Sequence, residues 1–463
     1  MSNKVNNGIV KSDINESDQV NAPTLKQAFW YWFKLGLISF GGPAGQISIM
    51  HQDLVENRRW ISEKRFLHAL NYCMVLPGPE AQQLATYIGW LLHRTWGGLI
   101  AGGLFVLPSL LILIGLSYIY MRFGSVPAIA GILYGVKPAV VAIVLFAAYK
   151  IGLRVLKNKA LWCIAAISFV AITFFQVAFP LIVLTAVLVG LLINQFQPTL
   201  FALSNGHAVA QKSAGRALID DDTPTPAHAL FRLKKMIKFI MVGFCLWLAA
   251  MLILVLQFGW DATLTQMGWF FTKAALLTFG GAYAVLPYVF QGAVTNYQWL
   301  NTAQMMDGLA LGETTPGPLI MVVTFVGFVG AWSQPFLGAD SALLSAIVAA
   351  CTVTFFTFLP SFIFIFVGAP FIESTQNNLR LTAPLTAITA AVVGVIMSLA
   401  IFFATHIFWP QNDFSLNHIL NGFDWFAFLL TLMAGFALFK LKLSVMKLIG
   451  IFALLGLLHH LLP

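Results

Sequence analysis

Hydrophobic residues in this chain form long continuous runs instead of alternating with polar residues at the period of a strand or of an amphipathic helix. A helix needs about 20 apolar residues to cross the hydrocarbon core of a bilayer. Runs such as residues 98–120 and 161–193 reach that length. The pattern predicts an all-α polytopic membrane protein with apolar segments at 26–50, 66–92, 97–121, 127–150, 160–175, 177–196, 236–257, 267–292, 304–330, 341–369, 383–409, 423–439 and 443–462.

The second half of the chain repeats the first. Shifts of 239 and 252 positions align Gly/Pro motifs of the two halves: Phe40-Gly41-Gly42 with Phe279-Gly280-Gly281, Pro77-Gly78-Pro79 with Pro316-Gly317-Pro318, and Leu107-Pro108-Ser109 with Leu359-Pro360-Ser361. Two related halves with broken apolar segments at matching places are typical of transporters whose substrate site lies between the halves.

The predicted organisation follows from this repeat. One apolar segment has no counterpart in the first half, and an odd extra crossing between two repeats would invert the second. We therefore expect inverted-topology repeats in this arrangement: a cytoplasmic N-terminal tail at 1–25, a first repeat at 26–196, a flexible cytoplasmic linker at 197–235, an inverting helix at 236–257 and a second repeat at 267–463.

Positive charge is an independent indicator of inversion. Arg58, Arg59, Lys64 and Arg65 make one loop strongly basic, whereas its repeat equivalent, residues 298–307, contains no Lys or Arg. Lys and Arg are enriched in cytoplasmic loops of membrane proteins. We expect the first loop and the N-terminus to be cytoplasmic and the second loop to lie outside.

The broken segments 26–50 and 66–92 have two interpretations. As re-entrant hairpins they return both their ends to the cytoplasm, which puts every Lys and Arg inside except Arg122, Lys137 and Lys273. As kinked helices that cross fully, they would put the N-terminus and the basic loop on opposite sides. The charge distribution favours Gly/Pro-broken re-entrant helices, but proline also kinks ordinary spanning helices.

The breaks are candidates for an anion site. Proline lacks a backbone donor and glycine permits positive φ, so these motifs free backbone groups that the bilayer tolerates only in protein or around a watery cavity. A helix that starts after a break presents free N–H groups and the positive end of its dipole. The alternative to an anion site is that the glycines and prolines only kink the helices for packing. The candidate residues are Gly41, Gly42, Pro43, Pro77, Gly78, Pro79, Gly280, Gly281 and Gly317.

Several polar side chains lie at predicted membrane depth. Lys137 needs a partner or a ligand there, unless it extends toward an interface. Glu80 and Glu313 are proton-relay candidates because desolvation favours the protonated carboxyl, although Glu80 also suits a helix N-terminus. Further candidates for the same cavity are Gln46, Asn71, Gln82, Thr314 and Thr315.

Composition narrows the function classes. The chain is 59% hydrophobic and 9% charged, against about 25% charged in soluble domains. The net charge of +9 reflects cytoplasmic loops and does not indicate nucleic acid. The four cysteines lack metal-ligand spacing, and no nucleotide-binding motif or nucleophile–base pair is recognisable. We therefore expect no cofactor, no metal and no enzymatic activity.

The motifs resemble one known family. The combination of Phe40-Gly41-Gly42-Pro43, Leu76-Pro77-Gly78-Pro79-Glu80 and Phe105-Val106-Leu107-Pro108-Ser109 is similar to the chromate transporter family, over nearly the whole chain and with two fused domains. The second half departs from the pattern, since Ala282 replaces Pro43 and Leu319 replaces Glu80.

The resemblance implies gradient-driven export of chromate across the bacterial inner membrane, with chromate resistance as the result and sulfate as a competitor. A carrier of sulfate or another oxyanion, working as an importer, is the alternative, and an anion channel is less favoured. The sequence leaves the oligomeric state open, with a homodimer as one possible assembly.

Overall fold

The described part of the chain is helical throughout, apart from one isolated β-bridge between Ile61 and Ile219. A computed structural model describes residues 21–40, 42–196, 217–224, 226–374, 382–410 and 422–461. Five of the described helices, α4, α5, α8, α13 and α14, are long and apolar enough to cross a membrane, which supports the prediction of an all-helical membrane protein.

The helices form two series that α8 connects. The first half contains α1 (Leu25–Ile38), α2 (Gly42–His51), α3 (Glu63–Val75), α4 (Glu80–Phe123), α5 (Pro127–Val155), α6 (Lys159–Phe175) and α7 (Phe179–Phe196). The connecting helix is α8 (Leu233–Phe258). The second half contains α9 (Thr263–Leu277), α10 (Ala282–Phe290), α11 (Thr302–Thr314), α12 (Val322–Ser333), α13 (Ala342–Ser374), α14 (Thr382–Phe408), α15 (Trp425–Phe439) and α16 (Val445–Leu461).

The same backbone features recur at the shift of 239 residues. A π-helical turn follows α2 at Gln52–Asn57 and another follows α10 at Gln291–Asn296. The helices α3 and α11 both contain 13 residues. Four glycines at equivalent breaks have positive φ, with values of 71° and 95° at Gly42 and Gly281 and of 127° and 102° at Gly78 and Gly317. Only glycine adopts such conformations at little cost, so the local sequence determines these breaks.

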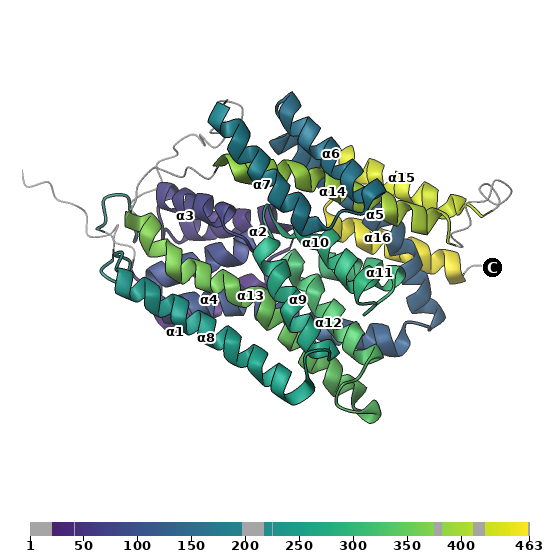
Figure 1. Ribbon diagram of the computed structural model, residues 1–463, viewed down its shortest axis with the longest axis horizontal. Coiled ribbons are helices and arrows are strands. Elements are labelled where there is room, and N and C mark those ends of the chain that lie inside the picture. Colours follow the sequence, from purple (N-terminus) through teal and green to yellow (C-terminus); the bar gives the residue numbers. More distant parts are fainter. Residues whose placement is uncertain are drawn as a thin grey trace, which may run out of the picture.

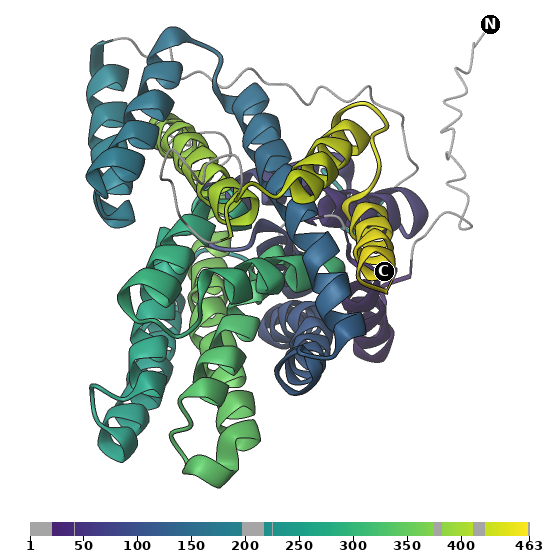
Figure 2. The same cartoon turned by 90° about the vertical axis from the view of Figure 1, so that its right-hand side faces the viewer.

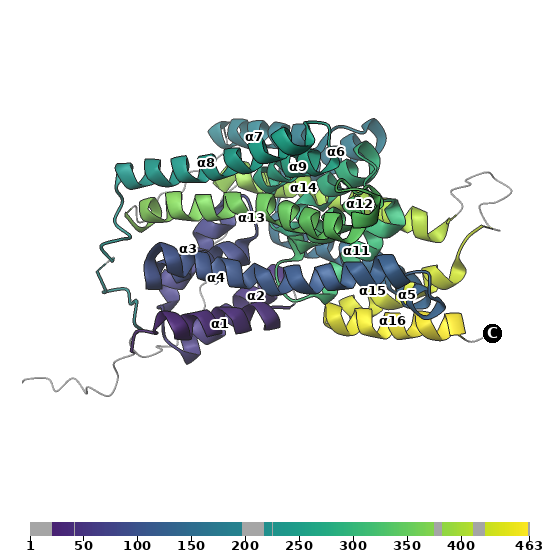
Figure 3. The same cartoon turned by 90° about the horizontal axis from the view of Figure 1, so that it is seen from below.

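Four helices pack side by side in the order α1, α4, α13 and α8 (Figure 3). Pro108 has no N–H group, so the Leu104 carbonyl of α4 lacks its helical donor. Gly36 of α1 lies against this carbonyl, and a methyl group on Gly36 would come within 2.3 Å of its oxygen. The proline and the glycine together allow the first helix of the repeat to approach α4 closely.

A second group of helices surrounds α5 and α14, which contact each other. Gly131 and Gly135 of α5 lie against Gly456 of α16, and this small-residue contact brings the two backbones together. The pair formed by α6 and α7 packs on α14 (Figure 2).

Segments that are distant in sequence meet at one end of the molecule, which we call the basic end: Pro23, residues 58–65, residues 90–94, the described part of residues 217–232, and Glu373. The His93 ring donates to the Pro23 carbonyl at 2.8 Å, and the rings of Tyr31 and Trp60 are 5.1 Å apart. In Figure 1 this end is at the left, where α8 begins and α13 ends.

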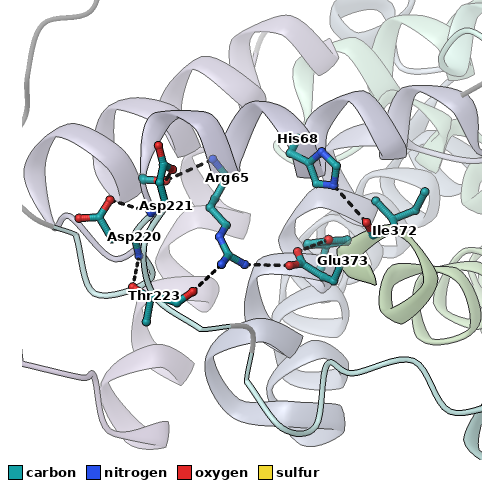
Figure 4. Close-up of polar contacts among 9 residues, drawn as sticks. Arg65, His68, Asp220, Asp221, Thr223, Ile372 and Glu373 are labelled. Atoms are coloured by element: carbon teal, nitrogen blue, oxygen red, sulfur yellow. Dashed lines mark hydrogen bonds and ion pairs between the residues drawn. The ribbon is translucent and has the colours of Figure 1, made fainter. Parts of the chain in front are cut away.

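Part of the predicted flexible linker is docked at the basic end (Figure 4). Arg65 of α3 donates to Glu373 of α13 at 2.8 Å and to the Thr223 carbonyl of the linker at 2.7 Å. The Ser62 hydroxyl donates to Asp221 at 2.6 Å. Residues 217–224 are therefore held against the first half, beside the Arg65–Glu373 pair that joins the two halves, and the polar composition alone did not predict this docking. Residues 1–20 and 197–216 of the predicted tail and linker lie outside the described residues.

The second half has a corresponding meeting point, which we call the far end: Thr263 at the start of α9, Trp299, and Gln334 after α12. Thr263 donates to Gln334 at 3.0 Å, and the ring of Trp299 stacks on Phe271 of α9. The helix α8 leads from the basic end to the far end, and its 26 residues span about 39 Å. The two meeting points are therefore separated by a bilayer-scale distance.

Candidate functional site in the junction of the four breaks

The four breaks meet at the centre of the molecule through two equivalent hydrogen bonds. The Gly78 amide donates to the Thr278 carbonyl at 2.7 Å, and the Gly317 amide donates to the Ser39 carbonyl at 2.8 Å. Position 39 corresponds to 278 and position 78 to 317 at the shift of 239 residues. Each bond therefore joins the second break of one half to the first break of the other. We call this region the break junction.

The local sequence explains why these groups are free to bond across the halves. Ser39 and Thr278 follow the last residues of α1 and α9, where helix carbonyls have no partner within their own helix. Gly78 and Gly317 each lie between two prolines, so their amides are the donors that remain in each Pro-Gly-Pro turn. In a membrane, where water cannot serve as the partner, the reciprocal bonds satisfy all four groups.

Gln46 reaches across the break junction. Its side chain is 1% exposed, and its amide nitrogen donates to the Gly317 carbonyl at 2.5 Å and to the Ser39 carbonyl at 3.3 Å. Gln46, a candidate for a cavity at the breaks, therefore lies beside Gly317 and Ser39. The equivalent residue of the second half is Val285, so the two sides of the junction differ.

Two neighbouring glutamines on α4 are also buried. Gln82 donates to the Thr86 hydroxyl at 3.1 Å, and Gln83 donates to the Pro77 carbonyl at 2.8 Å. The side-chain oxygen of each has no hydrogen-bond partner among the described residues. The same holds for three buried hydroxyls, those of Ser39, Ser109 and Ser361.

The predicted carboxylates lie next to the breaks. Glu80 is the first residue of α4, where its charge suits the helix dipole. Glu313, in the last turn of α11, accepts a hydrogen bond from the Tyr283 hydroxyl of α10. The hydroxyls of Thr314 and Thr315 donate back to the carbonyls of their own helix, at 2.8 and 3.0 Å.

Other predicted residues have different surroundings. Asn71 is exposed on α3 and does not belong to the buried cluster. Gly42 and Pro43 begin α2, Pro77 and Pro79 flank Gly78 between α3 and α4, and Gly280 and Gly281 lie between α9 and α10. Gly41 lies outside the described residues.

Lys137 has a partner that the sequence did not identify. Its ammonium group lies 3.6 Å from Asp307 of α11, and the Tyr120 hydroxyl donates to the same carboxylate oxygen at 3.0 Å. Asp307 is 3% exposed, and its second oxygen has no hydrogen-bond partner among the described residues. The pair joins α5 of the first half to α11 of the second, so Lys137 is not an isolated charge at an interface.

The remaining described residues offer weaker candidates for an anion site. An apolar groove of about 440 Å³ between α15 and α16 has only hydrophobic side chains in its lining, so it lacks hydrogen-bond donors for an anion. No group of three or more His, Cys, Asp or Glu residues in the described ranges could hold a metal ion.

Comparison of the sequence with known proteins shows the family to which the chain is related. The family model described as chromate transporter matches residues 26–191 and 265–457, which lie in the two halves. A chromate transport protein of Cupriavidus metallidurans is 31% identical over 384 residues, covering 82% of this chain and 83% of the relative. One from Pseudomonas aeruginosa is 32% identical over 376 residues, covering 80% and 79%. A solved structure with significant similarity was not found.

The matches confirm the resemblance seen in the Gly/Pro motifs. They cover both halves, and the helices identify the chain as a multi-pass membrane protein. The chain therefore belongs to the chromate transporter family, a family of transporters and not of enzymes.

Proposed function

We propose that this protein is a secondary transporter that exports chromate across the bacterial inner membrane and confers resistance to chromate. The family and the two bacterial relatives named chromate transport protein support the substrate. The observation that carries the mechanism is the pair of reciprocal bonds between Gly78 and Thr278 and between Gly317 and Ser39. It brings four interrupted helices to one place between two halves, which is where transporters of this design bind their substrates.

The chemistry of the break junction suits a tetrahedral dianion. Chromate offers only acceptor oxygens, so a desolvated site needs N–H or O–H donors and positive potential. The segments after the second breaks begin at Glu80 and at Leu319, and their N-termini supply free N–H groups and the positive end of the dipole. Sulfate has the same shape and charge, so we expect it to compete. We assign Glu80 and Glu313 to proton coupling.

We also propose that the broken segments are re-entrant hairpins and that the second repeat is inverted. Contacts at the basic end support the hairpins, because His93 returns to Pro23, just before α1, and Trp60, which follows α2, touches Tyr31 in the middle of α1. At the far end, the corresponding contacts of the second half join Thr263 to Gln334 and Trp299 to Phe271. In this arrangement the basic end is cytoplasmic and the far end is outside.

The exposed residues Asn57 and Asn296 are repeat equivalents and test this topology as a matched pair. Single cysteines at the two positions, in a background without the four native cysteines, should react with a membrane-impermeant thiol reagent from opposite sides. Asn57→Cys should label only in inverted vesicles and Asn296→Cys only in intact cells. Labelling of both from one side would contradict the inversion.

Replacement of Gly78 by valine tests the break junction in transport. Its φ of 127° is strained for valine, and a Cβ atom there would lie 2.4 Å from the Ser361 hydroxyl. We expect Gly78→Val to reduce chromate uptake into inverted vesicles below detection while the protein stays in the membrane.

Two glycines are controls for Gly78→Val. Gly115 of α4 has open space around its Cβ position and an ordinary helical φ, so Gly115→Val should transport normally. Gly42 has a positive φ but open space, so Gly42→Val tests conformational strain alone and should retain more activity than Gly78→Val. Normal uptake by Gly78→Val would show that the breaks kink the helices for packing and do not bind the substrate.

Lys137 is proposed to add positive charge to the same site. Its repeat equivalent, Thr389, lies 3.3 Å from the Cβ position of Gly280 in the second half's first break. In the first half, Lys137 of α5 lies beside Asp307 of α11 instead. Asp307 neutralises part of the Lys137 charge in the absence of substrate, since the two groups are 3.6 Å apart.

Two substitutions in this pair should change anion affinity in opposite directions. Lys137→Met should raise the half-saturating chromate concentration by about 10-fold, corresponding to about 1.4 kcal/mol. Asp307→Asn should lower it, because the Lys137 charge is then uncompensated. Lys150→Met is the control, since this lysine contacts the Phe146 ring near the other end of α5. Unchanged affinity in Lys137→Met would exclude Lys137 from the anion site.

A further inference from the structure

Two serines in the break junction are conspicuous because their hydroxyls are buried without a partner. Ser109 of α4 and Ser361 of α13 are 0% and 1% exposed. Neither hydroxyl has a hydrogen-bond partner among the described residues. A buried polar group without a partner costs about 1–3 kcal/mol, so an apolar residue at either position would make the empty protein more stable.

Each serine lies against the break of the opposite half. A Cβ atom on Gly317 would come within 2.8 Å of Ser109 Cβ and 3.2 Å of its Oγ. A Cβ atom on Gly78 would come within 2.4 Å of Ser361 Oγ. The two contacts are equivalent under the repeat, like the backbone bonds between the same breaks. The absence of side chains at Gly78 and Gly317 leaves room for the hydroxyls.

Other hydroxyls on α4 and α13, and that of Thr278 at the end of α9, behave differently. Those of Thr86, Thr278, Thr354 and Thr357 each donate to the carbonyl four residues earlier, at 2.7 to 2.9 Å. This internal bond is the usual way in which a helix satisfies a hydroxyl in an apolar environment. The hydroxyls of Ser109 and Ser361 do not make it, so both remain available to a ligand.

We infer that Ser109 and Ser361 donate hydrogen bonds to the transported oxyanion, one from each half of the protein. The inference rests on the proposed site at the break junction and names further groups that hold the substrate. Neutral O–H donors suit a carrier, because they select an acceptor-only dianion without adding fixed charges that would retain it. An anion bonded to both serines also links the two halves, which must move relative to each other during transport.

The experiment compares anion binding with stability in the purified full-length protein. The variants are Ser109→Ala, Ser361→Ala and the double substitution. The probes are chromate, sulfate and molybdate, measured by equilibrium binding, and thermal unfolding is measured without anion. Ser117→Ala is the matched control, because Ser117 lies on α4 about two turns after Ser109 and is also buried with an unpartnered hydroxyl.

Each single substitution should raise the dissociation constant by about 10-fold or more, and the double substitution should bring binding near the detection limit. The unfolding temperature should stay equal or rise, because an unpartnered hydroxyl is removed. Ser117→Ala should bind like the unaltered protein. The serine inference is overturned if Ser109→Ala and Ser361→Ala bind with unchanged affinity, or if Ser117→Ala weakens binding equally.

The two hypotheses can fail separately. If the unaltered protein binds sulfate or molybdate through the two serines but does not bind chromate, the proposed substrate is wrong and the hydroxyl site stands. If it binds and transports chromate with the serines replaced, the proposed function stands and the hydroxyl site is wrong.

Discussion

The structure depends on satisfying backbone groups inside a membrane. Glycines and prolines interrupt four helices, and each interruption leaves amides or carbonyls that water cannot reach. The amides of Gly78 and Gly317 bond to the carbonyls of Thr278 and Ser39, so each half completes the hydrogen bonding of the other. An unsatisfied backbone group costs several kcal/mol in lipid, and neither half could keep its breaks without the partner half.

The same arrangement explains how a site for an anion can arise without a cluster of cations. The groups near the breaks are neutral: the Gly78, Gly317 and Gln46 amides donate to carbonyls, and the hydroxyls of Ser109 and Ser361 have no partner among the described residues. Donors of this kind bind an oxyanion when their orientation is fixed in advance. The reciprocal bonds provide that fixed geometry.

The sequence predicted the breaks and their recurrence because glycine and proline act locally on the backbone. It also predicted that Lys137 has a partner or a ligand unless it extends toward an interface, since an isolated buried charge is costly. It did not identify Asp307, which lies 170 residues away in sequence and in a segment without any motif. Asn71, a further candidate, is exposed on α3, and a single polar residue in the sequence does not reveal which face of its helix is buried.

Ser109 and Ser361 were visible in the repeated Leu-Pro-Ser motif, yet the motif carried no sign that its hydroxyls lie against the opposite half. Contacts between the halves depend on the assembled fold. So does the docking of the linker, in which Asp221 and Thr223 accept from Ser62 and Arg65 of the first half. The differences between the halves, such as Gln46 against Val285, show that the repeat does not make the two sides of the junction equal.

The most direct test is a cryo-electron microscopy map of the protein in lipid nanodiscs with saturating chromate. The account predicts anion density at the break junction, with oxygen atoms within about 3.2 Å of amide or hydroxyl donors from both halves. Density confined to another place, such as the arginines of the basic end, with the bonds of Gly78 and Gly317 unchanged and no anion between them, would contradict it.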